Sequence, residues 1–230
     1  MGLSVALLTY GLLARGERWR LLFFCAVPYL SALSSLQLVP LVIALALTGC
    51  APLAMLVKPQ NALPLLLTYR SRWWSVVIAV VVFAASLLVM PDWPWKWLPL
   101  LKSYEGGAPL LLWFGPLLLL ALFCWEQPGA RLLVLLACCP QRDWYDALAL
   151  WLIPQTSRGM VILTLASWLA LPLTLFRFIF PELEWGRWHP GIRLIGCYFP
   201  ALAVLLWEQR GSVRPRVAAV ARVVAGVIRR

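Results

Sequence analysis

Long apolar runs make up most of this chain, and short polar interruptions divide them. A helix needs about 20 apolar residues to cross the roughly 30 Å hydrocarbon core of a bilayer. The runs that end at basic, aromatic or turn-forming residues predict seven crossing helices. These are residues 4–14, 21–33, 36–47, 75–90, 109–125, 160–176 and 194–207. The predicted fold class is an all-α, polytopic transmembrane helical bundle.

Two further apolar stretches are each split by a polar break that contains a Pro-Gln pair. The halves are residues 51–57 and 62–68 around a first break at 58–61, and residues 132–139 and 147–153 around a second break at 140–146. Each half is too short to span, because eight residues at 1.5 Å rise cover only about 12 Å. We therefore predict two broken or re-entrant elements. Non-helical backbone at that depth must be buried in protein or line a cavity.

The remaining segments are predicted to lie outside the hydrocarbon. Residues 91–107 begin with three tryptophans interleaved with two prolines, which indicates a loop on the headgroups, with sugar stacking as the alternative. Residues 177–193 form a mixed-charge loop. The arginine-rich segment 209–230 is predicted as an amphipathic helix on the membrane surface. The chain thus divides into a transmembrane helical domain, 1–208, and a basic cytoplasmic tail, 209–230.

Composition supports the membrane assignment, with 63% hydrophobic and 13% charged residues, against about 45–50% and 25% in soluble domains. The net charge of +11 indicates topology and contact with anionic lipids rather than nucleic acid, since no basic domain is present. In the predicted topology 13 of the 20 basic residues lie on the side of the tail. We expect a multi-pass protein of the cell inner membrane, in contact with membrane lipids, with its C-terminus in the cytoplasm.

The reactive side chains give little sign of a metal or cofactor site. The six cysteines all lie in apolar runs without zinc-site spacing, and His189 is the single histidine. We expect neither a metal nor a cofactor. The N-terminus lacks the basic region of a cleaved signal peptide, so residues 4–14 are expected to be a retained helix.

The two polar breaks hold the candidate functional residues. An ionisable group near the bilayer centre costs about 2.5–3.5 kcal/mol, so such residues are functional candidates. The alternative for Lys58 is that its amine reaches the nearest interface. The candidates are Lys58, Gln60 and Asn61 in the first break, and Arg142, Asp143, Tyr145 and Asp146 in the second.

These charges can be paired in more than one way. Arg142 and Asp143 could neutralise each other in an internal salt bridge, which leaves Asp146 without an adjacent base. Lys58 could pair with Asp146 across the bundle, or it could bind an anionic phosphate. The sequence does not decide whether the two breaks meet.

One part of the chain resembles a known family. Residues 37–73 contain Gln37-Leu38-Val39-Pro40, an apolar helix ending at Gly49, Lys58-Pro59-Gln60, and Arg70-Ser71-Arg72-Trp73. This pattern is similar to glycosyltransferase family 87, a mannosyltransferase-like group of the polytopic GT-C class. The resemblance implies transfer of a sugar from a polyprenyl-phosphate carrier at the extracytoplasmic face. It places Gln37, together with the residues of the two breaks, on the substrate side, and Lys58 against the lipid phosphate.

The catalytic residue is left unassigned. The resemblance implies a catalytic acid in the first extracytoplasmic loop, whereas Glu17, the only acid before Asp92, falls on the cytoplasmic side. Position 36 is leucine where the family pattern has glycine. We therefore expect the N-terminal helices and that acid to be missing from this chain. The alternative function is a non-catalytic membrane subunit or scaffold with a membrane protein partner, followed by a small transporter.

Overall fold

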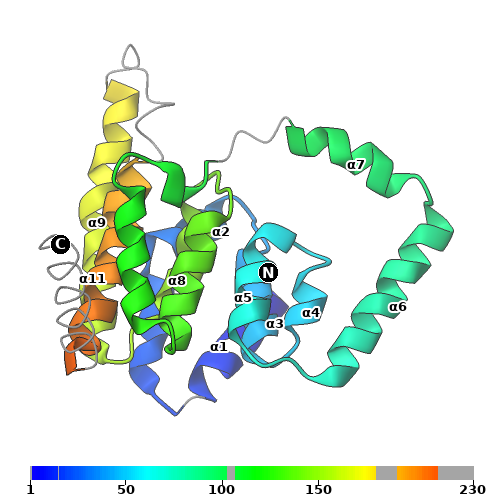
Figure 1. Cartoon of the computed structure of the whole chain (residues 1–230), viewed down its shortest axis with the longest axis horizontal. Helices are drawn as coiled ribbons and strands as arrows, with labels where there is room; N and C mark the ends of the chain where they lie inside the picture. The colour runs from blue at the N-terminus through cyan, green and yellow to red at the C-terminus, as the bar shows by residue number, and fades with distance from the viewer. Residues whose placement is uncertain (1, 15, 103–106, 180–190, 212–230) are drawn as a thin grey trace, which may run out of the picture.

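The computed structural model describes residues 2–14, 16–102, 107–179 and 191–211, and these fold into helices without any β-strand. Figure 1 shows a bundle of short helices, from which one pair, α6 and α7, projects as an arm. In chain order the described elements are α1 (Gly2–Leu13), η1 (Arg18–Cys25), α2 (Val27–Ser34), α3 (Val39–Leu47), α4 (Ala51–Ala54), α5 (Pro59–Thr68), α6 (Trp73–Val89), α7 (Trp93–Lys102), η2 (Pro109–Leu111), η3 (Gly115–Cys124), α8 (Pro128–Cys138), η4 (Trp144–Leu152), α9 (Ser157–Ile179), η5 (Leu194–Tyr198) and α11 (Phe199–Glu208).

Prolines decide where many of these helices begin. Proline lacks an N–H and has a fixed φ, so it is tolerated in the first turn of a helix and disruptive further in. Pro28, Pro40, Pro52, Pro59 and Pro128 each occupy the first or second position of a helix. The chain is therefore divided into short helices even where its sequence is continuously apolar.

Several predicted helices differ from the observed ones in their boundaries or type. Residues 21–33 were expected to form one helix, but η1 and α2 meet there at Ala26, whose backbone is extended. The predicted helix 36–47 begins at Val39, because Leu36 adopts a positive φ of 51° in the preceding turn. The predicted span 109–125 is wrong as a single helix, since two 3₁₀ segments, η2 and η3, replace it.

The segment 91–107 was predicted to be a loop, and this was wrong for its first part. Trp93–Lys102 forms the helix α7, with Pro94 in its first turn, where a missing N–H costs nothing. Trp95 remains 71% exposed, so the helix is not buried in the chain. The prediction overlooked that proline near a helix start is compatible with helix formation.

Two described helical stretches are long and apolar enough to cross a membrane, Ser157–Thr174 and Gly191–Glu208. The first belongs to α9, and the second contains the π-helical segment η5 followed by α11. Helices Gly2–Leu13, Trp73–Val89, Gly115–Cys124 and Pro128–Cys138 are apolar but shorter. The predicted tail lies outside the described residues from 212 onward, as does the middle of the predicted loop 177–193.

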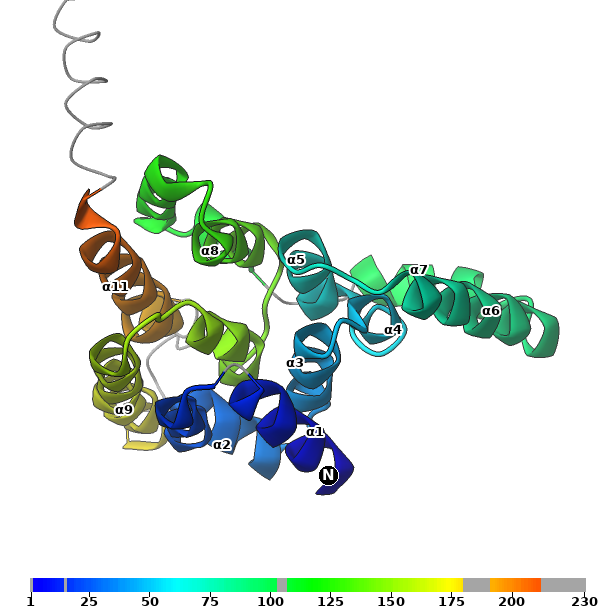
Figure 2. The same cartoon turned by 90° about the horizontal axis from the view of Figure 1, so that it is seen from below.

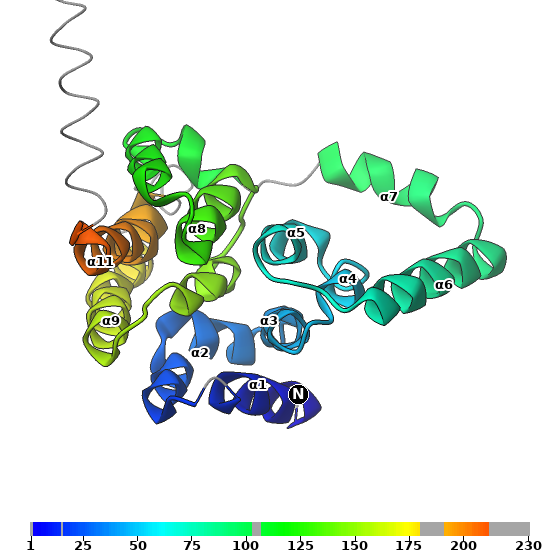
Figure 3. The same ribbon diagram turned by 60° about the horizontal axis from the view of Figure 1, so that its bottom comes forward.

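The core of the bundle is a single cluster of buried apolar side chains. α1 packs on α3, α2 on η4, α8 on η3 and α5, and α9 on η1, η5 and α11. Figure 2 and Figure 3 show these elements gathered together, while α6 and α7 extend away from them. The element η4 lies at the centre of the bundle, where all of its residues are buried.

Candidate functional site

The two polar breaks meet in the interior through an ion pair. Lys58 immediately precedes α5, and Asp146 lies in the first turn of η4. The Lys58 Nζ lies 2.6 Å from Oδ1 of Asp146, whose side chain is fully buried, while that of Lys58 is 15% exposed. Of the two pairings that the sequence left open for Lys58, the structure has the one with Asp146.

The second carboxylate oxygen of Asp146 is held by backbone groups. Its Oδ2 accepts hydrogen bonds from the N–H groups of Arg142, at 2.9 Å, and Asp143, at 3.3 Å. Asp143 in turn accepts a hydrogen bond from the N–H of Trp144, at 2.6 Å, in a capping box that starts η4. A buried charge is costly unless it is paired and hydrogen-bonded. Asp146 meets that requirement with three donors.

Two more contacts join the first turn of α5 to the first turn of η4. The ammonium group of Lys58 lies 4.3 Å from the ring centroid of Tyr145, which is a cation–π geometry. The side-chain amide of Asn61 donates to the backbone carbonyl of Asp146 at 3.2 Å. Lys58, Asn61, Tyr145 and Asp146 thus form one connected group, which we call the interlock.

Arg142 and Asp143 do not form the internal salt bridge expected from their adjacency. Of the residues that the structure describes, ion pairs join Lys58 to Asp146 and Arg20 to Glu17. Asp143 has an extended backbone, in which neighbouring side chains point to opposite faces, and its carboxylate turns to Trp144. Arg142 is exposed. It contributes its backbone N–H to the interlock rather than its charge.

Two further predicted residues take no part in the hydrogen bonds that the described residues form in the interlock. Gln37 sits in the turn between α2 and α3, where its side-chain amide donates to the carbonyl of Ser35 at 3.4 Å. Gln60 lies in the first turn of α5 with a half-buried side chain. Within the described residues neither glutamine hydrogen-bonds to Lys58 or Asp146.

Three residues that were not among the sequence-based candidates stabilise the second break: Gln141, which lies within it, and Arg193 and Tyr198. Arg193 is 4% exposed and donates to the carbonyls of Asp143, at 3.0 Å, and Gln141, at 3.2 Å. Gln141 is 3% exposed, and its side-chain amide donates to the carbonyl of Leu136 and to the hydroxyl of Tyr198. Arg193 immediately precedes a π-helical segment and Tyr198 ends it, and such segments are frequent at functional sites. A signal existed for Arg193, because it adjoins an apolar run, where an arginine is a functional candidate.

Polar atoms without a hydrogen-bond partner gather around the same place. They include the acceptors Asn61 Oδ1 and Gln141 Oε1 and the donors Trp144 Nε1 and Arg193 Nε, all buried and unpartnered within the described part of the chain. Such atoms are rare in folded proteins and call for an explanation such as a water or a ligand. The region around the interlock therefore contains buried donors and acceptors whose hydrogen-bonding capacity is not used by the described residues.

The chemistry available at the interlock is that of binding. Both oxygens of Asp146 are engaged, so it does not offer a free carboxylate. Lys58 uses one of its three donors on Asp146, and its side chain is 15% exposed, so the ammonium group retains donors for an anionic group. No cluster of three or more potential metal ligands occurs among the described residues.

Comparison with family models, with curated proteins and with solved structures finds no match. A function for this chain is therefore inferred from its own geometry and from the resemblance of its residues 37–73.

Proposed function

We propose that this chain is a GT-C-like membrane glycosyltransferase, or the C-terminal portion of one, that binds a polyprenyl-phosphate-linked sugar at the extracytoplasmic face. One observation carries the proposal. The Lys-Pro-Gln segment, which carries the resemblance, contacts the second polar break through Lys58 and Asp146 in the interior of the bundle. Two segments selected independently in the sequence thus belong to one site.

The geometry supports a binding role for Lys58 toward the lipid phosphate. Asp146 holds the amine in place, Tyr145 lies beneath it, and the side chain keeps 15% of its surface exposed. The unpartnered atoms around Gln141 and Arg193 are suited to the hydroxyl groups of a sugar. Because both oxygens of the Asp146 carboxylate already accept hydrogen bonds, we assign Asp146 a positioning role and expect the catalytic acid in another segment.

We further propose that the chain crosses the inner membrane several times, with its C-terminus in the cytoplasm. The two long apolar stretches support this, as does α6, which is 17 residues or about 25 Å long and is apolar on every side. A lysine at its centre, Val81→Lys, should reduce membrane insertion by about 2.5–3.5 kcal/mol. Insertion equal to that of the parent chain would contradict the placement of α6 in lipid.

Photo-crosslinking tests the substrate. Purified protein in nanodiscs is exposed to a photoactivatable polyprenyl-phosphate sugar and to the same lipid without phosphate. We expect labelling that depends on the phosphate and falls several-fold in Gln60→Ala. This variant removes a half-buried side chain beside Lys58 without touching the ion pair. Arg18→Gln, an exposed arginine on another element, is the matched control and should label like the parent. Equal labelling by both lipids would overturn the proposal.

The second candidate function is a non-catalytic membrane subunit or scaffold. The observation that favours it is the internal pairing of the charges, since Lys58 and Asp146 neutralise each other without a ligand. In that case Lys58→Ala would lower the stability and the recovery of a partner, with no specific loss of phosphate-dependent labelling. A membrane protein that co-purifies in a fixed ratio would support this function.

A further inference from the structure

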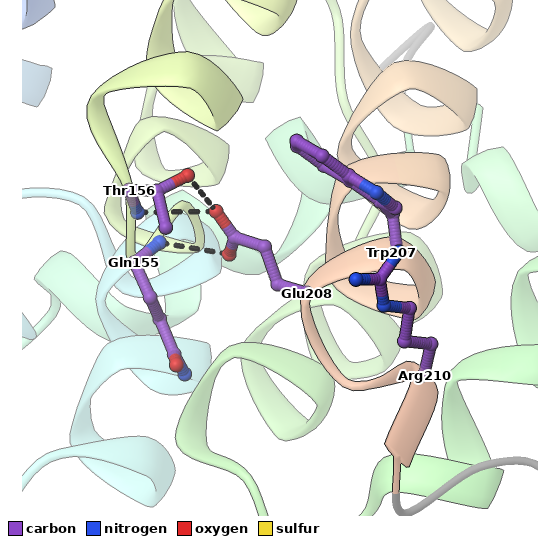
Figure 4. A pocket seen from close by; sticks show the side chains of 5 residues that line it. All are labelled: Gln155, Thr156, Trp207, Glu208 and Arg210. Carbon is purple, nitrogen blue, oxygen red and sulfur yellow. Dashed lines mark hydrogen bonds between the residues drawn. The ribbon is translucent and has the colours of Figure 1, made fainter.

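A surface pocket lies where α9 begins and α11 ends, apart from the interlock. Its volume is about 220 Å³, and its lining residues are Gln155, Thr156, Trp207, Glu208 and Arg210. Figure 4 shows Trp207 and Arg210 on the end of α11, with Glu208 reaching toward Gln155 and Thr156. The pocket therefore joins the ends of the two longest apolar stretches of the described chain.

The carboxylate of Glu208 is a fixed anion in this pocket. Its Oε2 accepts a hydrogen bond from the N–H of Gln155 at 2.9 Å, and its Oε1 accepts from the N–H and hydroxyl of Thr156 at 3.1 and 2.6 Å. Glycine at position 159 leaves room for the Glu208 carboxylate, because a Cβ there would lie 2.5 Å from Oε1. Each carboxylate oxygen accepts about two hydrogen bonds, so Oε2 keeps one position for a donor.

The guanidinium of Arg210 supplies the opposite charge on the same pocket. It is exposed, and it forms no ion pair with Glu208 or with another carboxylate among the described residues. Trp207 adds an indole that is 42% exposed. A guanidinium binds phosphate through two parallel hydrogen bonds, and an indole face attracts a cation. The pocket thus offers one position for an anion and one for an ammonium group.

We propose that this pocket binds the phosphoethanolamine headgroup of a membrane phospholipid. Arg210 receives the phosphate, and the primary ammonium donates to Oε2 of Glu208 while it lies against the ring of Trp207. A headgroup with phosphate alone would place its charge near the Glu208 carboxylate without compensation. A quaternary ammonium group has no N–H to donate. The inference depends on the membrane placement of the chain and not on glycosyl transfer.

The location of the pocket fits this ligand. Tryptophan and arginine are enriched where a transmembrane helix meets the headgroup layer. Here Trp207 lies at the end of a stretch, Gly191–Glu208, that is long and apolar enough to span, and Arg210 follows it. A lipid whose headgroup sits in the pocket can extend its acyl chains along the exposed apolar side chains of α9, such as Val161 and Leu165, which are 41% and 56% exposed.

Native mass spectrometry of the purified protein tests the headgroup specificity. The protein is incubated with equimolar phosphatidylethanolamine, phosphatidylcholine and phosphatidylglycerol, and the retained lipid is measured. We expect phosphatidylethanolamine to be retained about tenfold over the other two, as the loss of one charge-assisted hydrogen bond implies. Arg210→Gln should lower the retention of all three lipids, which share the phosphate, and Trp207→Leu should weaken the preference for phosphatidylethanolamine. Arg18→Gln, which changes an exposed arginine of η1, should preserve it.

Three results would overturn the inference. One is equal retention of the three lipids by the parent protein, and another is unchanged retention of phosphatidylethanolamine by Arg210→Gln. The third is displacement of the lipid by soluble phosphoethanolamine at the same concentration, which would identify a soluble ligand. None of these results changes the phosphate-dependent labelling expected at Lys58, so the two proposals can fail separately.

Discussion

The interlock and the α6–α7 arm are both built from strongly apolar sequence, yet they have opposite structures. Around Lys58 and Asp146 the helices are short, interrupted and buried, and polar groups join their ends. The arm contains a regular helix of 17 residues in which Ser75 is the buried residue. Val80, Val81 and Leu88 of this helix are 61, 60 and 87% exposed.

The difference shows what a break in a helix requires. A continuous helix satisfies its own backbone, so α6 needs only an apolar environment such as lipid. Each interruption frees N–H and C=O groups that must find partners when they are buried. In the interlock these partners are the carboxylate of Asp146 and the amide of Asn61, and nearby the guanidinium of Arg193. The polar residues therefore accumulate where the helices are broken.

The largest effect is expected from Lys58→Ala. It leaves the fully buried carboxylate of Asp146 without its counter-ion, and removal of one partner of a buried ion pair costs about 3–5 kcal/mol. The thermal unfolding of the purified protein in detergent measures this loss. Arg142→Ala is the control, because that side chain is exposed and the Arg142 contact to Asp146 is made by its backbone.

Exchange of the two charges, Lys58→Asp with Asp146→Lys, should not restore stability. Asp146 also accepts hydrogen bonds from the N–H groups of Arg142 and Asp143. A lysine at position 146 would place its ammonium donors against these N–H donors, which would then have no acceptor. A charge-exchanged protein as stable as the parent would show that the ion pair alone matters. It would contradict the role of Asp146 in ordering the break.

The sequence predicted the polar breaks but not how they are joined. Lys58 and Asp146 were both found because ionisable residues in apolar runs are unusual, and their pairing was one of two open alternatives. Arg193 was missed because it binds the backbone carbonyls of Gln141 and Asp143, which have no side-chain signature. The salt bridge considered for Arg142 and Asp143 does not form. The side chains of neighbouring residues in an extended backbone point to opposite faces, so adjacency in sequence does not bring them together.

The sequence likewise predicted that helices form more reliably than where they begin and end. Apolar runs indicated helices near α1, α6 and α9, where few prolines intervene. The boundaries elsewhere depend on which proline starts a helix and which interrupts one, and that choice is made by tertiary packing. Pro94 was interpreted as a helix breaker and lies instead in the first turn of α7. The seven-span topology therefore remains a prediction beyond the two long stretches.

The same substitution, leucine to alanine, compares the buried bundle with the exposed α6–α7 arm. Leu133 of α8 is fully buried, and Leu88 of α6 is 87% exposed. Leu133→Ala should destabilise the protein by about 2–5 kcal/mol through lost contacts and a cavity. Leu88→Ala should change stability by less than about 0.5 kcal/mol, as substitutions away from packed contacts usually do. Thermal unfolding measures both variants. An equal loss in the two would mean that a protein surface, rather than lipid, covers the arm.

A local effect, with little loss of overall stability, is expected at the joint of the arm. The indole N–H of Trp93 donates to the hydroxyl of Ser86 at 3.1 Å, and the rings of Trp93 and Phe83 meet edge to face at 5.9 Å. Ser86→Ala removes a hydrogen bond worth about 0.5–1.5 kcal/mol, which is too little to unfold α6 but enough to loosen the angle between α6 and α7. Spin labels at Val77 and Leu98, both exposed, should report a broader distance distribution in this variant, with Ser34→Ala unchanged as the control. A distribution as narrow as that of the parent would mean that the ring contact alone fixes the bend. If it broadens, the joint of the arm depends on one side-chain pair, whereas the interlock is held by several contacts at once.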